Sequence, residues 1–234
     1  MNLESIEKRI LFEDNHLLIL NKNPSELVQG DKTGDVTLPD LIKNYLKVKH
    51  NKPGNVFCGV THRLDRPTSG IVVFAKTSKA LERMNKIFQE KQSKKTYWAI
   101  IENKPSKEND TLTDYLLKKE KLNKSFAYKN EVKGSKKAIL HYQTVQQSQN
   151  YFLLEIDLET GRHHQIRCQL ANIQCYIKGD VKYGAKRSNE NGSIDLHARK
   201  ISFLHPVSKE KIEIIAPVPP TTLWKHFENS LLNK

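Results

Sequence analysis

The sequence lacks several features that define other classes of protein. It has only three cysteines, Cys58, Cys168 and Cys175, and no two of them form a Cys-x-x-Cys pair. An odd number of cysteines without such a pair argues against a disulfide framework or a zinc ribbon. The N-terminus has no apolar signal segment, and no stretch approaches the ~18 apolar residues of a membrane span. We therefore expect a soluble, reduced protein of the cytoplasm, with no membrane as partner.

Acidic residues are also scarce. The 234 residues include 26 Asp and Glu against 39 Lys and Arg, which gives a formal net charge of +13. The excess is uneven, because residues 86–137 hold 14 lysines and 7 acidic residues. A solubilising surface can also be basic, but clustered lysines attract phosphates without reading sequence. The composition therefore favours a nucleic acid as the partner.

The spacing of apolar residues predicts an α+β fold. Helices are expected over residues 37–47 and 78–92, the second capped by Ser78, and a short helix after Gly161 should turn Ile166, Leu170 and Ile173 inward. Short apolar or alternating runs predict strands at residues 16–21, 70–76, 95–102, 137–145, 151–159, 198–206 and 211–217. This balance predicts a mixed, mostly antiparallel sheet with flanking helices. Because no repeat or low-complexity linker interrupts the chain, we expect a single domain over residues 1–234.

The stretch HRLDRPTSG, residues 62–70, places one carboxylate between two guanidinium groups. Asp65 lies between Arg63 and Arg66, and neighbouring positive charges favour the ionised form of a carboxylate. An ionised Asp suits a nucleophile, a base or an electrostatic anchor better than a general acid. If residues 62–64 are extended, a Thr-Ser-Gly turn would lead the chain into the apolar strand that follows. Charge alone also allows an ordinary structural Arg–Asp pair.

Four blocks of the sequence, in order, resemble the RluA-type pseudouridine synthases. HRLDRPTSG is similar to the family signature HRLDxxTSG, and KTYWAII (residues 95–101) is similar to KxYxAxV. GRHHQIRCQLANIQCYIKGDVKYG (residues 161–184) is similar to GRTHQIRxHLAxxGxPIxGDxxYG. The C-terminal block, residues 196–220, resembles LHAxxLxFxHPxxxxxxxxxAPLP. The resemblance covers residues 15–220, and it implies the pseudouridine synthase catalytic fold.

This resemblance implies an isomerase that converts uridine to pseudouridine in RNA without a cofactor. By position in the blocks, Asp65 is the catalytic aspartate, Tyr97 faces the pyrimidine and Arg167 pairs with the Asp65 carboxylate. Flipping the target base out of its stack costs a few kcal/mol, and Arg63 would fill the vacancy. The expected partner is a stem-loop of transfer or ribosomal RNA, bound by a monomer. The expected RNA contacts are His62, Arg63, Arg66, Arg162 and His164.

Other roles for these residues remain open from the sequence. Tyr97 could be a core aromatic of its strand, and Arg167 could bind phosphate instead of a carboxylate. Whether Asp65 attacks the base, attacks C1′ or removes a sugar proton is not decided by the motif, since each step needs an ionised, oriented carboxylate. His62, His163 and His164 have no third ligand at a zinc-type spacing, so no metal site is expected.

Two further activities compete with the isomerase. An RNA-binding protein could keep the fold without catalysis, although the complete set of Asp65, Tyr97 and Arg167 disfavours it. A carboxylate-dependent hydrolase would need a second acidic residue paired with Asp65, and the motif contains none.

The sequence departs from the family pattern at a few positions. Where the family has NKPxGLLVxxG, residues 21–30 read NKNPSELVQG, with Asn23, Ser25 and Glu26 at the Pro, Gly and Leu positions. A serine restricts positive φ, so we expect a differently shaped loop there. His163 replaces a Thr, and Gln174 and Tyr176 replace a Gly and a Pro. Residues 1–13 are too short for the S4-like RNA-binding domain that precedes the catalytic domain in some relatives.

Overall fold

The structure, a computed structural model, describes residues 3–31 and 34–232. The chain divides into two compact units, and each unit is made of two stretches of sequence. Unit 1 comprises Met1–Lys94 and Ala198–Pro217, and unit 2 comprises Lys95–His197 and Val218–Lys234. That residues 1–234 act as one domain stays a proposal, and residues 1–2 and 233–234 lie outside the description.

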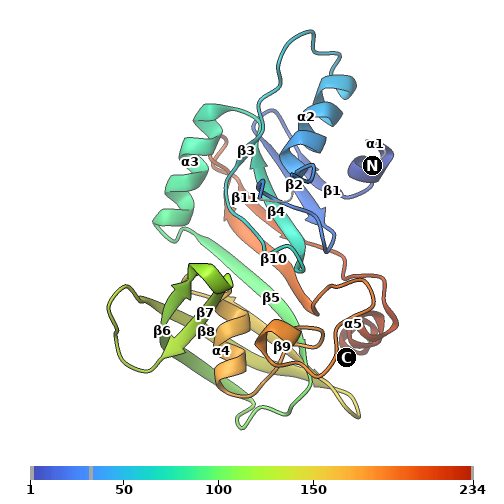
Figure 1. The fold of residues 1–234 in the computed structure, drawn as a ribbon. Coiled ribbons are helices and arrows are strands. Elements are labelled where there is room, and N and C mark those ends of the chain that lie inside the picture. Colours follow the sequence, from blue (N-terminus) through green and yellow to red (C-terminus); the bar gives the residue numbers. More distant parts are fainter. Residues whose placement is uncertain (1–2, 32–33, 233–234) are drawn as a thin grey trace. The chain divides into compact units, whose positions relative to one another are not determined.

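Figure 1 labels the α-helices and the strands of the chain. In chain order, the elements are α1 (Leu3–Glu7), β1 (Ile10–Glu13), β2 (Leu17–Lys22), α2 (Leu38–Lys49), β3 (Gly59–Val60), β4 (Ser69–Ala75), α3 (Ser78–Gln89), β5 (Ser93–Ile101), β6 (Asn109–Lys119), the 3-10 helix η1 (Glu120–Leu122), β7 (Lys124–Tyr128), β8 (Lys136–Gln147), β9 (Phe152–Leu158), α4 (Gln165–Asn172), the 3-10 helix η2 (Val181–Tyr183), β10 (Leu196–Leu204), β11 (Lys211–Ile215) and α5 (Thr222–Leu232).

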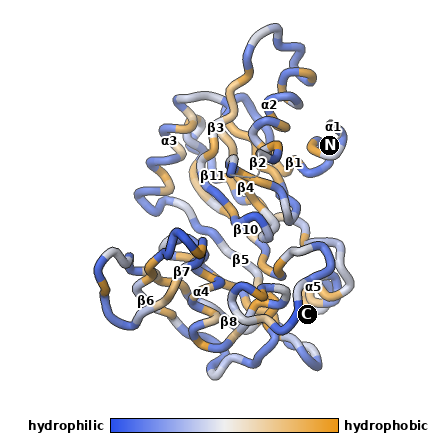
Figure 2. Tube along the Cα trace, in the orientation of Figure 1, coloured by the Kyte–Doolittle hydropathy of each residue, from blue (hydrophilic) through white to orange (hydrophobic). Residues whose placement is uncertain are grey.

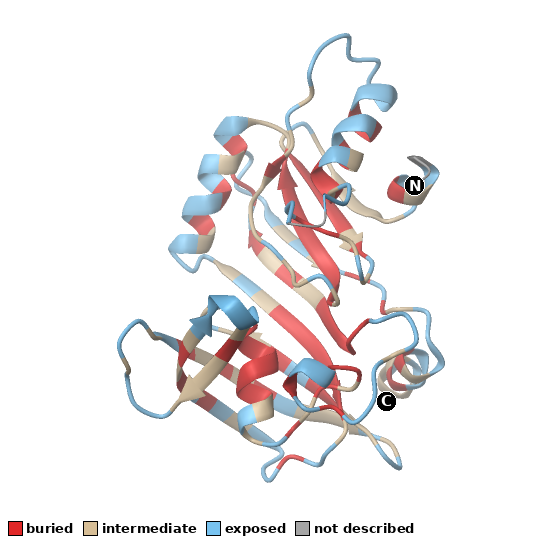
Figure 3. Cartoon of the chain, viewed as in Figure 1, coloured by how far each residue is buried: buried red, intermediate tan, exposed pale blue. Residues whose placement is uncertain are grey.

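The sheet of unit 1 has the strand order β1-β2-β4-β10, with β3 on β4 and β11 on β10. The β1–β2, β2–β4, β3–β4 and β10–β11 pairs are antiparallel. Every residue of β4 is buried and β2 is nearly so, as Figure 3 shows in red. Strands buried on both faces read as continuous apolar runs, and in Figure 2 hydrophobic residues are gathered on these strands. Helices α1 and α2 pack on the face that carries Leu18, Leu20, Val72 and Phe74.

Unit 2 is an antiparallel sheet in the order β5-β9-β8-β6-β7. The strand register places Leu116 and Ala138 on one face, which α4 covers with Cys168. Trp98 and Ile100 lie on the opposite face, which α5 covers. Because side chains alternate along a strand, Tyr97 lies on the face that α4 covers.

The structure confirms the α+β class, and most of the expected elements occur. Helix α2 begins after Thr37 with Pro39 in its first turn. Helix α3 begins at Ser78 as expected and ends at Gln89, three residues before the expected end. The expected cap was wrong, because the hydroxyl of Thr77, not Ser78, accepts the backbone N–H of Ala80 (3.1 Å). In α4, Ile166 and Leu170 are buried as expected, whereas Ile173 follows the helix and is half-exposed.

Candidate active site

Asp65 opens a tight turn at the entrance to β4. Its backbone carbonyl accepts the N–H of Thr68 (3.0 Å), so Arg66 and Pro67 form the corner. The expected Thr-Ser-Gly turn at residues 68–70 was therefore misplaced, since the turn spans residues 65–68 and Ser69 and Gly70 already belong to β4. Proline is favoured at the first of the two central positions of such a turn and is disfavoured at the second. Pro67 occupies the second of these positions, after Arg66. The Asp65 carboxylate is thereby placed on a short hydrogen-bonded loop next to a buried strand.

A buried lysine holds this turn from within unit 1. Lys22, at the end of β2, is 0 % exposed. Its Nζ donates to the backbone carbonyls of Asn23 (2.9 Å), Arg66 (3.0 Å) and Thr68 (2.6 Å). An ammonium has three donors, so these three bonds use all of them. Lys22 was not among the site residues expected from the sequence, although it lies in the same block as Asn23, Ser25 and Glu26.

The loop after β2 is attached to the turn by its backbone as well. Ser25 donates its N–H to the Arg66 carbonyl (2.8 Å) and accepts from Arg66 Nε (3.2 Å). Ser25 has φ 71°, so the expectation that a serine would avoid the glycine conformation is wrong. Its two bonds to Arg66 hold the left-handed conformation, which normally costs an L-residue about 1–2 kcal/mol.

Glu26 stands where the family pattern has an apolar residue, and its carboxylate is paired with Arg9. Its Oε2 accepts from Arg9 Nη1 (2.7 Å) and from the N–H of Asn23 (2.9 Å). Both side chains of the Arg9–Glu26 pair are largely buried, at 13 % and 8 % exposure. A buried carboxylate needs such a partner, so Arg9 explains how Glu26 is tolerated here.

The side chains near Asp65 in sequence reach different partners. Arg63 is exposed and its Nη1 donates to Gln29 Oε1 (2.6 Å). Arg66 is also exposed and its Nη2 binds Asp35 Oδ2 (2.8 Å). His62 Nε2 accepts the backbone N–H of Val73 (3.1 Å), and its ring meets Phe88 edge-on. Arg63 and Arg66 thus lie where RNA could reach them, while His62 ties its loop to β4.

In unit 2, Tyr97 is a buried residue of β5, 8 % exposed and opposite Ile156 of β9. Lys95, two residues earlier, lies on the same face of the strand. Burial lowers the pKa of Lys95 to about 8. Lys95 was not among the site residues expected from the sequence, although it is the first residue of the KxY block.

Arg167 forms a bidentate ion pair inside unit 2. Its Nε and Nη2 donate to the two carboxylate oxygens of Asp180, at 2.6 and 2.8 Å. The two side chains are 5 % and 1 % exposed, and the guanidinium lies 5.0 Å from the centre of the Tyr183 ring. Asp180 was not among the site residues expected from the sequence, although it lies in the same block as Arg167. The pairing of Arg167 with Asp65 stays a prediction.

His163 and His164 stack at the start of α4, with ring centres 3.8 Å apart. His164 has φ 52°, and its Nδ1 lies 3.0 Å from the hydroxyl of Tyr183. Burial lowers the pKa of His164 to about 2, with Arg167 adding to the effect, so the ring is neutral. Arg162 is exposed and donates from Nε to the Lys137 carbonyl (3.0 Å).

Lysines cluster around the start of β7. Lys124 donates to the Lys182 carbonyl (2.6 Å), and Lys182 donates to the Asn123 carbonyl (3.2 Å). Lys119 Nζ lies 4.7 Å from the centre of the half-exposed Phe126 ring. Lys119 and Lys124 of this basic edge belong to the lysine-rich segment of residues 86–137, and Lys182 joins them from η2.

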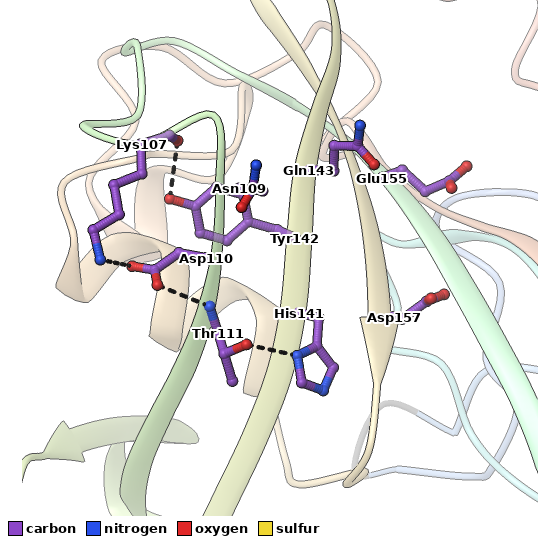
Figure 4. A pocket seen from close by; sticks show the side chains of 9 residues that line it. All are labelled: Lys107, Asn109, Asp110, Thr111, His141, Tyr142, Gln143, Glu155 and Asp157. Carbon is purple, nitrogen blue, oxygen red and sulfur yellow. Dashed lines mark hydrogen bonds and ion pairs between the residues drawn. The ribbon is translucent and has the colours of Figure 1, made fainter.

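A hollow of about 550 Å³ lies on the face of the unit 2 sheet opposite to the one that α4 covers (Figure 4). Its lining includes Thr111, His141, Glu155 and Asp157. Thr111 Oγ1 and His141 Nδ1 are 2.7 Å apart. The strand register places these side chains on the face opposite Tyr97. The hollow therefore does not open on the sheet face that carries Tyr97.

Neither a metal-binding group nor a membrane-spanning helix is found in the described part of the chain. Within residues 3–31 and 34–232, no three His, Cys, Asp or Glu side chains are grouped to bind a metal ion. In the same residues, no helix is long and apolar enough to cross a membrane.

Comparisons with known proteins agree with the motif blocks. The family described as RNA pseudouridylate synthase matches residues 16–172. An uncharacterised RNA pseudouridine synthase of Synechocystis is 32% identical over 98% of this chain and 69% of its own length. Ribosomal large subunit pseudouridine synthase D of Zymomonas mobilis is 31% identical over 92% of this chain and 71% of its own.

A solved structure shares the fold. The human protein named RNA pseudouridylate synthase domain containing 4 superposes with a TM-score of 0.80 at 22% identity. The match covers 98% of this chain and 95% of that one. The α+β arrangement described above is therefore one already seen in a pseudouridylate synthase domain.

Proposed function

The chain belongs to the RNA pseudouridylate synthase family and is an RNA pseudouridine synthase, an isomerase; we propose that Asp65 is its catalytic carboxylate. The observation that carries the proposal is the hydrogen-bonded turn of residues 65–68, which begins at the Asp of the HRLD block and whose backbone binds the buried Lys22. A carboxylate on a fixed backbone can be aimed at a reacting atom, and effective catalysis depends on such placement.

The proposed reaction needs no external reactant. The N1–C1′ bond of the uridine breaks, C5 joins C1′, the C5 proton leaves and N1 gains a proton. The base must first leave its stack. Arg63, exposed and bonded through one terminal nitrogen to Gln29, can then stack in the vacancy. Tyr97 would lie against the uracil.

We propose that Arg167 orients Asp65 while Asp180 keeps the guanidinium in place. The Asp180 pair uses Nε and Nη2, and a guanidinium has five N–H donors in a fixed fork. The proposed role therefore needs only its Nη1 side. Arg167→Lys keeps the charge but loses the fork, so it should lower kcat at least a hundredfold with little change in KM. Equal loss of RNA binding in a filter assay would instead indicate a phosphate contact.

The partner is RNA, and the basic edge at the start of β7 supports a phosphate grip. We propose a stem-loop of transfer or ribosomal RNA as substrate, bound by a monomer in the cytoplasm. Lys121 is an exposed residue of η1, which precedes β7 in the chain. If it contacts a phosphate, Lys121→Gln should weaken binding equally across sequences and reduce the slope of log K against log salt by about 1. An unchanged slope would place the grip elsewhere.

The decisive experiment is tritium release from RNA labelled at C5 of uridine. The wild-type protein should release tritium, and Asp65→Asn should lower the rate at least a thousandfold while keeping the RNA affinity. Asp40→Asn, an exposed aspartate in the first turn of α2, is the matched control and should remain active. Mapping pseudouridine in cells with and without the protein would identify the substrate. RNA binding without any release would favour the non-catalytic alternative.

A further inference from the structure

Lys22 is a buried titratable group that the proposed reaction does not yet use. Its aliphatic stem lies in β2, opposite Gly70 of β4, and its Nζ meets three backbone carbonyls. Two of these carbonyls, from Arg66 and Thr68, belong to the turn that Asp65 opens. The Arg66 carbonyl also accepts the Ser25 N–H. The turn is therefore bound on its inner side by one side chain.

The number of protons on Nζ decides whether these bonds can form. An ammonium has three N–H donors and no acceptor. A neutral amine has two donors and a lone pair, which would face a carbonyl oxygen. Three carbonyls within 3.0 Å are therefore compatible with the charged form only.

We propose that the Lys22 ammonium is a positioning group for Asp65: it fixes the turn of residues 65–68, and turnover requires its protonated form. This inference rests on the proposed role of Asp65. Lys22 does not touch the substrate in this account and acts only through the backbone that carries the carboxylate.

The charges around Lys22 set the pH range of the effect. Burial lowers the pKa of Lys22 to about 7, and the positive Arg9 and Arg66 add to the lowering, while the negative Glu26 and Asp65 oppose it. Above that pH the folded protein loses the proton and with it one of the three bonds, and the lone pair of the amine then faces a carbonyl oxygen. The rate should therefore fall as pH rises through about 7.

The stability should change in the opposite direction. In the unfolded chain Lys22 keeps its proton up to its ordinary pKa, so between the two values the unfolded state binds more protons than the folded state. Stability rises with pH wherever this is so. Activity that falls while stability rises over the same range cannot come from general unfolding.

The test measures the single-turnover rate of tritium release at saturating RNA between pH 6 and pH 8.5. We expect roughly a tenfold or larger fall for the wild type, which follows from the fraction protonated around a pKa near 7. Lys22→Met should lower kcat at least tenfold, keep KM within twofold and remove the pH dependence. A pH limb that persists in Lys22→Met would overturn the proposal.

A matched control and a direct titration keep the test decisive. Lys76, just after the opposite end of β4, is 9 % exposed and donates to Glu13 and to the Asp14 carbonyl. Lys76→Met should lower the melting temperature but keep kcat and the pH limb. An NMR titration of the Lys22 side chain in intact protein should show loss of the proton near neutral pH. Retention of the proton above pH 9 would refute the inference even if Lys22→Met failed to fold.

The two proposals fail in distinguishable ways. If Asp65→Asn releases tritium at the wild-type rate, the proposed role of Asp65 is wrong. If Asp65→Asn is inactive while Lys22→Met keeps the wild-type rate and pH limb, only the role of Lys22 is wrong.

Discussion

Lys22 in unit 1 and Arg167 in unit 2 are both buried cations with a proposed part in catalysis, but different groups bind them. The Lys22 Nζ meets three backbone carbonyls, which carry only partial charges. Arg167 meets the full negative charge of Asp180 in a bidentate pair. A guanidinium stays protonated in proteins, whereas a buried ammonium loses its proton readily. Arg167 therefore keeps its charge at every physiological pH, whereas the charge of Lys22 depends on the pH.

Removing the carboxylate from the Arg167 pair should produce the largest effect. Asp180→Asn leaves a buried guanidinium without its counter-charge, and breaking such a pair costs about 3–5 kcal/mol. Urea unfolding would measure the loss. Glu120→Gln removes an exposed carboxylate of the same unit and should change the free energy of unfolding by less than about 0.5 kcal/mol. Equal effects of the two variants would mean that the Asp180 pair is not buried in solution.

The Arg9–Glu26 pair gives the equivalent experiment in unit 1. Glu26→Leu restores the residue of the family pattern but leaves Arg9 buried alone, so we expect a loss of about 3 kcal/mol. The double variant Arg9→Leu/Glu26→Leu should recover most of it. Because Glu26 raises the pKa of Lys22, Glu26→Leu should also move the high-pH fall in activity to lower pH. Additive losses in the double variant would show that the two side chains act independently.

Glu13 tests a carboxylate that several cations share. Burial alone would raise its pKa, but hydrogen bonds from Lys76, His50 and Lys49 outweigh it and lower the pKa to about 2. A lowered carboxyl pKa stabilises the fold above pH 4.5, and this contribution is lost as the pH falls toward 2. Glu13→Gln should cost about 2 kcal/mol at pH 7 and flatten the acid side of the stability curve. An unchanged acid limb would contradict the shared pairing.

The smallest effect is expected at two exposed positions, one in each unit. Ser25 and Gln174 have φ 71° and 61°, and the family pattern has glycine at both. Ser25→Gly and Gln174→Gly should each raise the free energy of unfolding by up to about 1 kcal/mol, less the entropy that glycine adds to the unfolded chain. A loss at Ser25 alone would mean that its side chain supports the turn of residues 65–68.

The sequence predicted the elements whose patterns are regular and missed those interrupted by buried polar groups. The apolar run of β4 and the stripe of α2 were correctly assigned. Strand β6 was missed because Asp114 occupies a buried position between Leu112 and Leu116. Asp114 is tolerated there because it accepts hydrogen bonds from Gln169 Nε2 (2.9 Å) and Lys129 Nζ (3.0 Å). Partners so distant in sequence cannot be inferred from local periodicity.

The candidate site shows the same limit. The motif blocks identified Asp65, Tyr97 and Arg167, whose catalytic roles remain to be tested. Neither Lys22 nor Asp180 was found, because each acts on residues 13 or more positions away: Lys22 on Arg66, and Asp180 on Arg167. A lysine at the end of an otherwise apolar strand, as in LLILNK, is the signal that could have marked Lys22.

Gly70 has a consequence for how the chain can be assembled. It has φ 109°, and a Cβ there would lie 2.4 Å from the carbonyl oxygen of Ala198, on the neighbouring strand β10. Strand β4 must therefore pair closely with β10, and the ribosome makes β10 only after nearly all of unit 2. Pairing of strands so distant in sequence is intrinsically slow. A growing chain should carry β4 with an unfinished edge until the ribosome has passed residue 217, so the fold cannot be completed in the order in which it is translated.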